Sequence, residues 1–315
     1  MICVLGSFDG FHLGHRKLFE AAEKMASELD DSWCVVTFSP HPQSVLGKGP
    51  FPVLFTEPEK DILGFCLGVP EINRITFTPE CAELDPPSFL ELLENNFFLQ
   101  GFVVGEDFRF GRGRTGDAVK LAELAGAKSW KTSIVESFFL DGRKVASSSI
   151  RKKIETGKAD EAARELGYPF FLSGTVIHGQ GRGRRIGFPT INIKTPRSKI
   201  IPAKGVYSGC LSLGRKVFPA AVNIGINPTF PGIREISCEA HIPGFRGDLY
   251  DKEVSLFLFR RIRMEKTFRS AVELVEQMRL DIKECLVEWD KHKPLAEGFI
   301  ECCSPGSRQD ADTSE

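Results

Sequence analysis

The first half of the chain alternates strand-like apolar runs with segments of helical periodicity. Apolar runs of strand length occupy residues 1–8, 32–38 and 101–108. Apolar residues recur at helical spacing in residues 13–29, 85–97 and 118–127. Strands and helices that follow one another in turn predict a parallel sheet with helices packed on it, so the fold class expected here is α/β.

The pattern changes after Tyr168, where short apolar runs are separated by glycine, proline and asparagine. These runs occupy residues 170–178, 191–195, 205–213, 217–225, 236–244 and 254–264. Their spacing predicts a closed antiparallel β-barrel. A helical segment at 268–292 follows, and its apolar positions 272, 275, 278, 282, 286 and 289 fall on one stripe.

A charged, helix-prone segment at 152–169 separates the two patterns and ends at Pro169. Because domains usually contain roughly 100–200 residues, we expect two of them, at 1–167 and 168–293. The residues from 294 to 315 are mostly polar, which is typical of a disordered tail.

Composition and charge narrow the class of protein further. The 315 residues include 41 basic and 42 acidic side chains, a net charge of −1, so no global field attracts nucleic acid or anionic lipid. No apolar run reaches the roughly 20 residues of a membrane span. The nine cysteines include no CxxC pair, which predicts reduced thiols in a cytoplasmic protein. We expect no nucleic-acid or membrane partner, and a monomer or weak homo-oligomer.

The segment GSFDGFHLGH at 6–15 follows the first strand and places His12 and His15 on one face at the start of a helix. The carboxyl ends of parallel strands bind ligands in open α/β sheets, and a helix N-terminus offers free N–H groups to phosphate. Glycine lets the backbone approach a ligand, and histidine can donate to a transferring phosphoryl group. Phosphate binding is therefore favoured, with a metal site that adds His41 and a purely structural turn as the alternatives.

Two other nucleotide motifs are not supported. Gly111, Gly113 and Gly116 form a GxGxxG, but the motif lies well inside the domain and no convincing acidic ribose ligand follows it. A hydride-transfer function is therefore not expected. Arg112 and Arg114, which are interleaved with these glycines, suit an anionic ligand or a solvated basic loop. The chain contains no GxxxxGK[ST], which excludes a P-loop kinase.

The segment HGQGRGRRIGFPTIN at 178–192 combines glycines with three arginines ahead of a strand. Such a loop can fold its N–H groups over phosphates while arginine supplies the charge; a mobile surface hairpin is the alternative. Thr190 and Asn192 are alternate residues, so their side chains share one face of the strand. Oxygen ligands of this kind suit Mg²⁺, which also binds substrate phosphates.

Several segments, in order along the chain, resemble one family. GSFDGFHLGH is similar to the G-x-F-D-G-x-H-x-G-H signature of the nucleotidylyltransferase module of bifunctional riboflavin kinase/FAD synthetases. Further blocks of that module are resembled by FSPHP at 38–42, VVGEDFRFGRGRTGD at 103–117 and SSSIR at 147–151. FPTIN at 188–192 resembles the G-x-P-T-x-N signature of the riboflavin kinase module. The likeness continues through KGVYSG, AVNIGINPTF and CEAHIPGFRGDLY.

The resemblance implies a Rossmann-like nucleotidylyltransferase domain followed by a riboflavin kinase β-barrel with a terminal helix. The barrel would phosphorylate riboflavin to FMN with ATP and Mg²⁺, and the first domain would adenylylate FMN to FAD with release of pyrophosphate. Ala146 stands where the family has its first serine, and Asp251 stands where the family has glycine after DLY. The alternatives are a riboflavin kinase with a weak or inactive adenylyltransferase module, and a flavin- or nucleotide-binding regulator without turnover.

The same resemblance implies the roles of individual residues. The implied catalytic residues are His12, His15 and Arg151 for adenylyl transfer, and Glu239 as the general base of the kinase. ATP would be bound by Gly6, Asp9, Gly14, Ser147, Ser148, Gly179, Gly183, Gly187, Pro189 and Thr190. The flavins riboflavin, FMN and FAD would be bound by Phe38, Pro40, His41, Pro42, Asp107, Phe108, Phe110, Asp248 and Tyr250. Thr190 and Asn192 would bind Mg²⁺.

Overall fold

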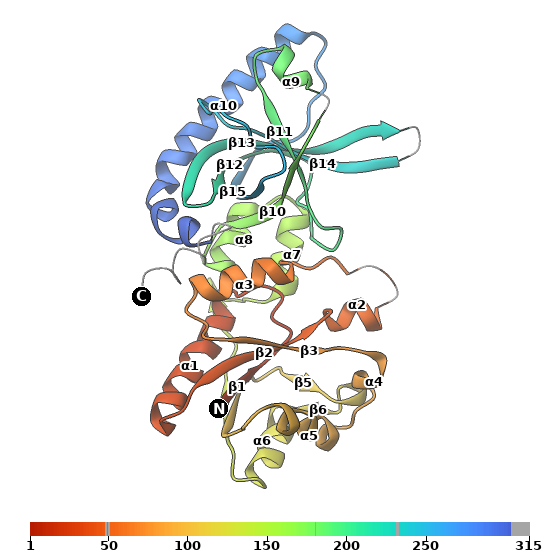
Figure 1. Cartoon of the computed structure of the whole chain (residues 1–315), viewed down its shortest axis with the longest axis vertical. Coiled ribbons are helices and arrows are strands. Elements are labelled where there is room, and N and C mark those ends of the chain that lie inside the picture. The colour runs from red at the N-terminus through yellow and green to blue at the C-terminus, as the bar shows by residue number, and fades with distance from the viewer. Residues whose placement is uncertain (48, 50, 180, 231–232, 304–315) are drawn as a thin grey trace. The chain divides into compact units, whose positions relative to one another are not determined.

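The computed structural model describes residues 1–47, 49, 51–179, 181–230 and 233–303. The chain forms two compact units, Met1–Ser147 and Ser148–Glu315 (Figure 1). Each unit contains a sheet of its own, parallel in the first and antiparallel in the second. The two units are therefore described one at a time.

The first unit is built on a five-stranded parallel sheet in the order β3-β2-β1-β4-β7. Its inner strands β1 (Ile2–Leu5), β2 (Trp33–Ser39) and β4 (Gly101–Gly105) confirm the strands expected from the apolar runs. The edge strands β3 (Ile72–Thr76) and β7 (Lys131–Val135) have no counterpart in the expected elements. Edge strands are only partly buried, so they tolerate polar residues and lack a continuous apolar run.

Helices pack on both faces of this sheet (Figure 1). The longer ones are α1 (Leu13–Leu29), α3 (Glu57–Cys66), α5 (Pro86–Asn96) and α6 (Ala118–Gly126). Alternate residues of a strand face opposite sides, and Cys3 and Leu5 of β1 join the core that α5 and α6 cover. The shorter elements are α2 (Pro42–Leu46), α4 (Pro79–Ala82), β5 (Arg109–Phe110), η1 (Arg112–Arg114), β6 (Gly116–Asp117), β8 (Phe139–Leu140) and β9 (Arg143–Lys144).

The second unit contains a closed antiparallel barrel in the order β10-β11-β14-β13-β12-β15, as the sequence predicts. Its strands are β10 (Phe170–Ile177), β11 (Thr190–Lys194), β12 (Gly205–Leu213), β13 (Lys216–Phe230), β14 (Ile233–His241) and β15 (Glu253–Arg263). The pairing of β10 with β15 closes the barrel. The helices α7 (Ser147–Glu155) and α8 (Ala159–Leu166) precede it, and α9 (Arg182–Arg185) lies between β10 and β11.

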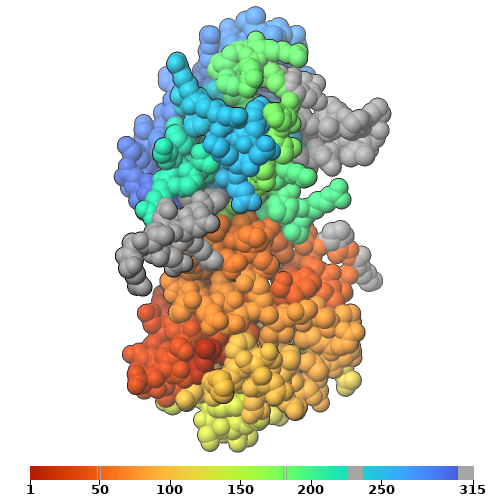
Figure 2. All heavy atoms as spheres, viewed as in Figure 1, coloured from red at the N-terminus to blue at the C-terminus, as the bar shows by residue number. Residues whose placement is uncertain are grey.

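Helix α10 (Ala271–Leu295) packs on β12, β13 and β15, and its outer side is exposed along the barrel unit, blue in Figure 2. Two residues of the predicted apolar stripe are exposed to solvent: the exposed fraction is 68% for Val272 and 38% for Leu286. Asp281 is buried instead, since the guanidinium of Arg263 pairs with its carboxylate at 2.8 Å. The spacing of apolar residues cannot predict a buried charge of this kind, because it identifies the buried face of a helix only by its hydrophobic residues.

The chain stays helical past residue 294, where the sequence predicts the start of a disordered tail. A π-helical turn, η2 (Ala296–Ile300), follows α10 directly. Ala296, Ile300 and Cys303 are buried, and the ring of Phe299 stacks on Tyr168 at 5.0 Å. Residues 294–303 are thus ordered because their apolar side chains pack, in place of the disorder expected there. Residues 304–315 of the expected tail lie outside the described residues.

Candidate active sites

The turn from Gly6 to His15 joins the carboxyl end of β1 to α1. Gly10 has a φ of +112°, which side-chain-bearing residues rarely adopt, and a Cβ there would lie 3.2 Å from the ring of Phe55. His12 is the N-cap of α1, and its Nδ1 accepts a hydrogen bond of 3.3 Å from the backbone N–H of His15. The turn therefore places both imidazoles at the N-terminus of the helix.

The imidazole rings of His12 and His15 stack, with centroids 3.6 Å apart and planes inclined by 16°. His15 Nδ1 lies 2.5 Å from the carbonyl oxygen of Gly10 and donates to it. Because Nδ1 of His12 accepts a hydrogen bond, the neutral ring of His12 carries its proton on Nε2. The neutral ring of His15 has the opposite tautomer, with an unprotonated Nε2. His12 can therefore donate to a phosphate oxygen, and His15 can take up a proton.

Both imidazoles are neutral near pH 7. Burial lowers the pKa of His12 well below its ordinary value, and the neighbouring His15 acts in the same direction. Burial lowers the pKa of His15 to about 4, although the Gly10 carbonyl and the Asp107 carboxylate oppose this shift. A bound phosphate would raise the pKa of each histidine, because a nearby anion favours the imidazolium form. The pair can thus gain positive charge when an anion arrives.

A cleft of about 660 Å³, here called the N-terminal cleft, opens beside this turn. Its lining includes eleven of the residues that the sequence predicts for ATP and flavins: Gly6, His12, Gly14, His15, Phe38, His41, Pro42, Asp107, Phe108, Phe110 and Ser147. The rings of Phe108 and Phe110 stack at 5.5 Å, and Phe110 lies 5.2 Å from Phe89. These aromatic side chains form a wall on which a planar ring system could pack.

Cationic side chains line the same cleft. Lys144 Nζ lies 2.7 Å from Asp107 Oδ2, and the lining also includes Arg109 and Arg114. Anionic phosphates are attracted by such a group of cations. Lys144 belongs to the short β8–β9 hairpin, which has neither a motif nor a periodicity, and so no sequence signal marks it as a ligand contact.

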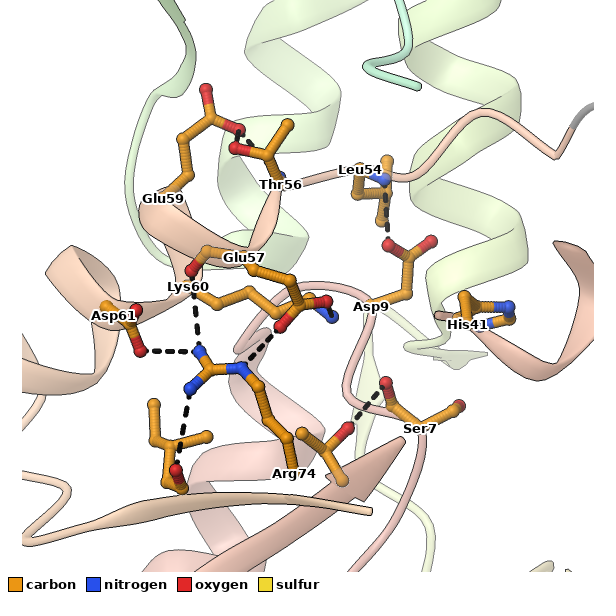
Figure 3. A network of polar contacts seen from close by, with 12 residues as sticks. Ser7, Asp9, His41, Leu54, Thr56, Glu57, Glu59, Lys60, Asp61 and Arg74 are labelled. Atoms are coloured by element: carbon orange, nitrogen blue, oxygen red, sulfur yellow. Dashed lines mark hydrogen bonds and ion pairs between the residues drawn. The ribbon is translucent and has the colours of Figure 1, made fainter. Parts of the chain in front are cut away.

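Two predicted residues of the first unit, Asp9 and Pro40, do not line the N-terminal cleft. Asp9 is buried, and its Oδ1 accepts a hydrogen bond of 2.8 Å from the N–H of Leu54 (Figure 3). In this structure its carboxylate therefore holds the segment before α3 against the turn. Ser148 and Arg151 follow Ser147 in α7 and belong to the second unit.

The metal site considered for the histidines has no support in the structure. His41 Nδ1 accepts a hydrogen bond of 3.2 Å from the N–H of Gln43, and its ring stacks on Phe51 at 4.5 Å. Over the part of the chain that the structure describes, no three His, Cys, Asp or Glu side chains are grouped in a way that could hold a metal ion.

The barrel unit has a cavity of about 520 Å³, here called the barrel cavity, whose lining includes Gly183, Thr190 and Glu239. The strand register brings Glu239 of β14 opposite Asn192 of β11 on one side and Asn223 of β13 on the other. Residues paired across antiparallel strands project to the same face, so these three polar side chains form a row. Thr190 Oγ1 also donates to Glu239 Oε2 at 3.4 Å.

The backbone at Gly179 passes close to the side chain of Asn192. A Cβ at Gly179 would lie only 2.0 Å from Asn192 Nδ2, so a residue larger than glycine would collide with the amide. The hydroxyl of Thr190, the amide of Asn192 and the carboxylate of Glu239 supply oxygen donors, which are the ligands that Mg²⁺ prefers. These residues fit the magnesium site that the sequence predicts.

Helix α10 and the segment before it contribute apolar side chains to the lining of the barrel cavity, beside the polar side chains of Glu265, Lys266, Thr267 and Asp281. The apolar residues are Phe268, Leu274, Met278 and Ile282. No ligand contact was expected from this helix, because apolar periodicity does not separate a face that packs on a core from one that lines a cavity.

Five residues predicted for ATP or flavin in the barrel unit lie outside the lining of the cavity, namely Gly179, Gly187, Pro189, Asp248 and Tyr250. Asn192 of the predicted metal pair is not in the lining either. The carbonyl of Pro189 lies 2.8 Å from His241 Nδ1, and the ring of Tyr250 stacks on His178 at 3.8 Å. Asp248 Oδ1 accepts a hydrogen bond of 2.9 Å from the N–H of Tyr250. The binding of ATP or flavin by these residues stays a prediction from the family resemblance.

Comparison with known proteins finds both modules in one chain. Residues 1–149 match the FAD synthetase family, and residues 166–287 match the riboflavin kinase family. The bifunctional riboflavin kinase/FMN adenylyltransferase of Bacillus subtilis (strain 168) is 34% identical over 289 residues, which cover 90% of this chain and 91% of that protein. The chain belongs to the bifunctional riboflavin kinase/FMN adenylyltransferase family. The resemblance seen in the motifs is thereby confirmed.

The chain is also similar to a second curated relative and to a solved structure. The bifunctional riboflavin kinase/FMN adenylyltransferase of Escherichia coli (strain K12) is 34% identical over 285 residues, which cover 89% of this chain and 90% of that protein. A crystal structure described as a macrolide-efflux protein from Streptococcus pneumoniae superposes with a TM-score of 0.82 at 30% identity, over 90% of this chain and 92% of that one. In the residues whose structure is described here, no helix is both long and apolar enough to span a membrane.

The two cavities fall in different modules of the family. The N-terminal cleft is lined only by residues of the FAD synthetase match, and the barrel cavity only by residues of the riboflavin kinase match. Asn223 is a lining residue that the sequence analysis did not single out, although it lies within the AVNIGINPTF block. A polar residue in an otherwise apolar strand would have been the signal for it.

Proposed function

We propose that the chain makes FAD from riboflavin in two ATP-dependent steps. The barrel domain phosphorylates riboflavin to FMN, and the N-terminal domain transfers the adenylyl group of ATP to FMN and releases pyrophosphate. The observation that carries the proposal is that each unit has its own cavity lined by residues of its own motif. The family match extends through both units, which favours two activities over the kinase-only alternative.

We assign adenylyl transfer to residues 1–167 and riboflavin phosphorylation to residues 168–293. Helix α8 ends at Leu166, and the first barrel strand begins at Phe170, so the proposed boundary falls in the connection between them. Residues 148–167, which the proposal assigns to the adenylyltransferase, lie in the compact unit that contains the barrel. Activity of each separately expressed segment would test this assignment.

In adenylyl transfer, the phosphate of FMN attacks the α-phosphorus of ATP, so the protein has to position two anions and neutralise their charge. His12 donates from Nε2 to a phosphate oxygen, and His15 takes up a proton as negative charge develops. The aromatic wall that includes Phe108 and Phe110 holds the flavin ring. Lys144 attracts the phosphate of FMN, and Ser147, Ser148 and Arg151 keep their predicted role of binding the triphosphate.

In the kinase reaction, Glu239 accepts the proton of the riboflavin 5′-hydroxyl while that oxygen attacks the γ-phosphorus of ATP. Thr190 and Asn192 would hold Mg²⁺, which when bound would supply positive charge to the phosphates of ATP. Asn223 lies across from Glu239 and orients its carboxylate. The apolar side chains of α10, with Phe268, hold the flavin ring in the barrel cavity.

The experiment is to incubate the purified protein with riboflavin, ATP and Mg²⁺ and to resolve the flavins by chromatography. FMN and then FAD should appear, and FAD should also appear when FMN replaces riboflavin. Addition of EDTA should stop the formation of FMN. Formation of FMN without FAD would support the kinase-only alternative. Absence of both products would contradict the proposal, and tight flavin binding without turnover would then indicate a regulator.

Replacement of Met278 by tryptophan should raise the KM for riboflavin about tenfold, the effect of roughly 1.4 kcal/mol. The larger ring would occupy part of the cavity wall formed by α10. Leu280→Trp is the control, because Leu280 lies on the same helix but is 61% exposed. Steady-state kinetics with riboflavin and with ATP provide the measurement. A rise in the KM for ATP alone would place the nucleotide, not the flavin, against α10.

The partners of both reactions are small molecules: ATP, riboflavin and FMN. We place the protein in the cytoplasm because its cysteines fit a reducing compartment. Cys3 and Cys34, for example, are buried thiols whose Sγ atoms lie 3.8 Å apart. A monomer or weak homo-oligomer stays the expectation from the sequence, and sedimentation of the purified protein would test it.

A further inference from the structure

Lys60 of α3 is fully buried, an environment that is costly for an ammonium group unless other groups compensate for it. Its Nζ lies 2.9 Å from Oε1 of Glu57, one turn earlier in the helix. Glu57 is shared, because its Oε2 accepts a hydrogen bond of 2.7 Å from Nε of Arg74 on β3. Arg74 in turn binds Asp61 Oδ1 at 2.5 Å. The motifs that identify the family contain none of these four residues.

The cluster of Glu57, Lys60, Asp61 and Arg74 contains two cations and two anions, but these charges are unevenly placed. The side chain of Lys60 is 0% exposed, whereas those of Glu57, Asp61 and Arg74 are 33%, 35% and 26% exposed. The innermost charge is therefore the ammonium group, and both carboxylates lie nearer to solvent. The cluster as a whole is neutral, and the side chain of Asp9, toward which Lys60 extends, is buried as well (Figure 3).

The side chain of Lys60 lies next to the turn from Gly6 to His15, here called the phosphate turn. Figure 3 shows the side chain of Lys60 directed toward the part of the chain that carries Asp9. The segment that leads into α3 is tied to the same turn, since the N–H of Leu54 donates to Asp9 at 2.8 Å. The ring of Phe55 also packs against Gly10, where an added Cβ would lie 3.2 Å away. The position of Lys60 is thus coupled to the backbone of the turn.

The positive charge of Lys60 affects the pKa of His15. Burial is the main cause that lowers the pKa of His15 to about 4, and the positive charge of Lys60 acts in the same direction. The other groups that face His15 are the Gly10 carbonyl and the Asp107 carboxylate, which raise its pKa, and the neutral ring of His12 stacked on it. Lys60 is therefore a fixed cation that opposes protonation of His15.

We propose that Lys60 is a positioning residue for adenylyl transfer: its ammonium group, paired with a carboxylate of Glu57 that Arg74 also binds, supports the Gly6–His15 turn on the side of Asp9 and supplies a fixed positive charge near His15. In the free enzyme this charge adds to the effect of burial, which keeps the imidazole neutral. When ATP binds, the same charge attracts its phosphates without any rearrangement, as preorganised electrostatic groups do. The inference rests on the proposed adenylyltransferase function of the N-terminal domain.

The first test is the variant Lys60→Met, which removes the charge and keeps most of the apolar stem. Its kcat/KM for FAD formation from FMN and ATP should fall about tenfold, while FMN formation from riboflavin in the other domain should not change. Lys120→Met is the matched control. Lys120 forms an ion pair with Glu123 at the same i,i+3 spacing, but its side chain is 48% exposed, and this variant should keep both activities.

A second readout separates positioning from stability alone. Loss of the Lys60 charge removes a repulsion, so the pKa of His15 should rise and the ring should become protonated at higher pH. Histidine-labelled full-length protein, which has six histidines, can be titrated by ¹⁵N NMR, with His15→Ala to assign the resonance. The acid limb of the pH profile for FAD formation should move to higher pH with it. A purely structural lysine would lower the rate without moving this titration.

The double variant Glu57→Gln/Lys60→Met decides the question even where Lys60→Met alone does not fold. Removing both partners leaves no unpaired buried charge, so the double variant is expected to fold. It should show the same loss of FAD formation and the same upward shift of the His15 titration. If the wild-type protein forms FAD and the double variant matches it in both measurements, Lys60 is not a positioning residue. Absence of FAD from the wild-type protein would instead overturn the proposed function itself.

Discussion

Replacement of Glu239 by glutamine is expected to lower the rate of riboflavin phosphorylation by about 10²- to 10⁴-fold. Glutamine keeps the size of the side chain and can still accept the hydrogen bond from Thr190 Oγ1, which lies 3.4 Å from Glu239. It cannot take the proton from the 5′-hydroxyl of riboflavin, so the loss should appear in kcat. The measurement is FMN formation at saturating ATP and riboflavin, followed by chromatography.

Glu253→Gln is the matched control for this change, because Glu253 is an exposed carboxylate at the start of β15. It should leave FMN formation unchanged. Both variants should convert supplied FMN to FAD at the wild-type rate, since adenylyl transfer takes place in the other domain. Wild-type FMN formation by Glu239→Gln would mean that this carboxylate is not the general base, despite its place in the polar row of the barrel cavity.

Replacement of His15 by alanine is expected to lower FAD formation from FMN by about 10²- to 10³-fold and to leave FMN formation unchanged. The variant loses the imidazole that lines the N-terminal cleft and that can gain a proton as charge develops on the phosphates. It also loses the hydrogen bond to the Gly10 carbonyl. Rates of FAD formation and FMN formation are measured separately, each with its own flavin substrate.

His15→Asn separates the two losses, because its side-chain amide can still donate to the Gly10 carbonyl. If the imidazole itself acts on phosphate, this variant should be nearly as slow as His15→Ala. Recovery of most of the activity would show that His15 serves only to hold the turn. If His15→Ala abolished both products in a folded protein, the assignment of the two reactions to the two domains would be wrong.

Strongly periodic segments of the fold were predictable. The helix expected at 13–29 is α1 (Leu13–Leu29), and all six apolar runs of the second half are strands of the barrel. The edge strands β3 and β7 and the helix α3 were not expected. For α3 a local signal existed, because Thr56 and Glu59 form a capping box at its start. The edge strands carry no such signal, since their partly exposed side chains follow no apolar run.

Some residues of the candidate sites were predictable from the sequence, and others were not. Motif residues at strand ends, such as His12 and Asp107, line one cleft, and Thr190 and Glu239 line the other cavity. Lys144, the α10 side chains and Lys60 were not expected. Lys144 lies in a hairpin without a motif, and the α10 residues resemble ordinary core positions. Lys60 looks like a surface lysine of a helix until its burial is known.

The sequence by itself determined the α/β and barrel halves, the family, and the residue types proposed to bind phosphate and Mg²⁺. These follow from local information, namely periodicity, turn chemistry and motif spacing, which act over a few residues. Only the tertiary structure decided which charges are buried and what they face. Lys60 of α3 and Asp281 of α10 are buried because distant segments, β3 and β15, supply the arginines of the two ion-pair networks. Burial and electrostatic coupling depend on such contacts between remote parts of the chain, which no local pattern encodes.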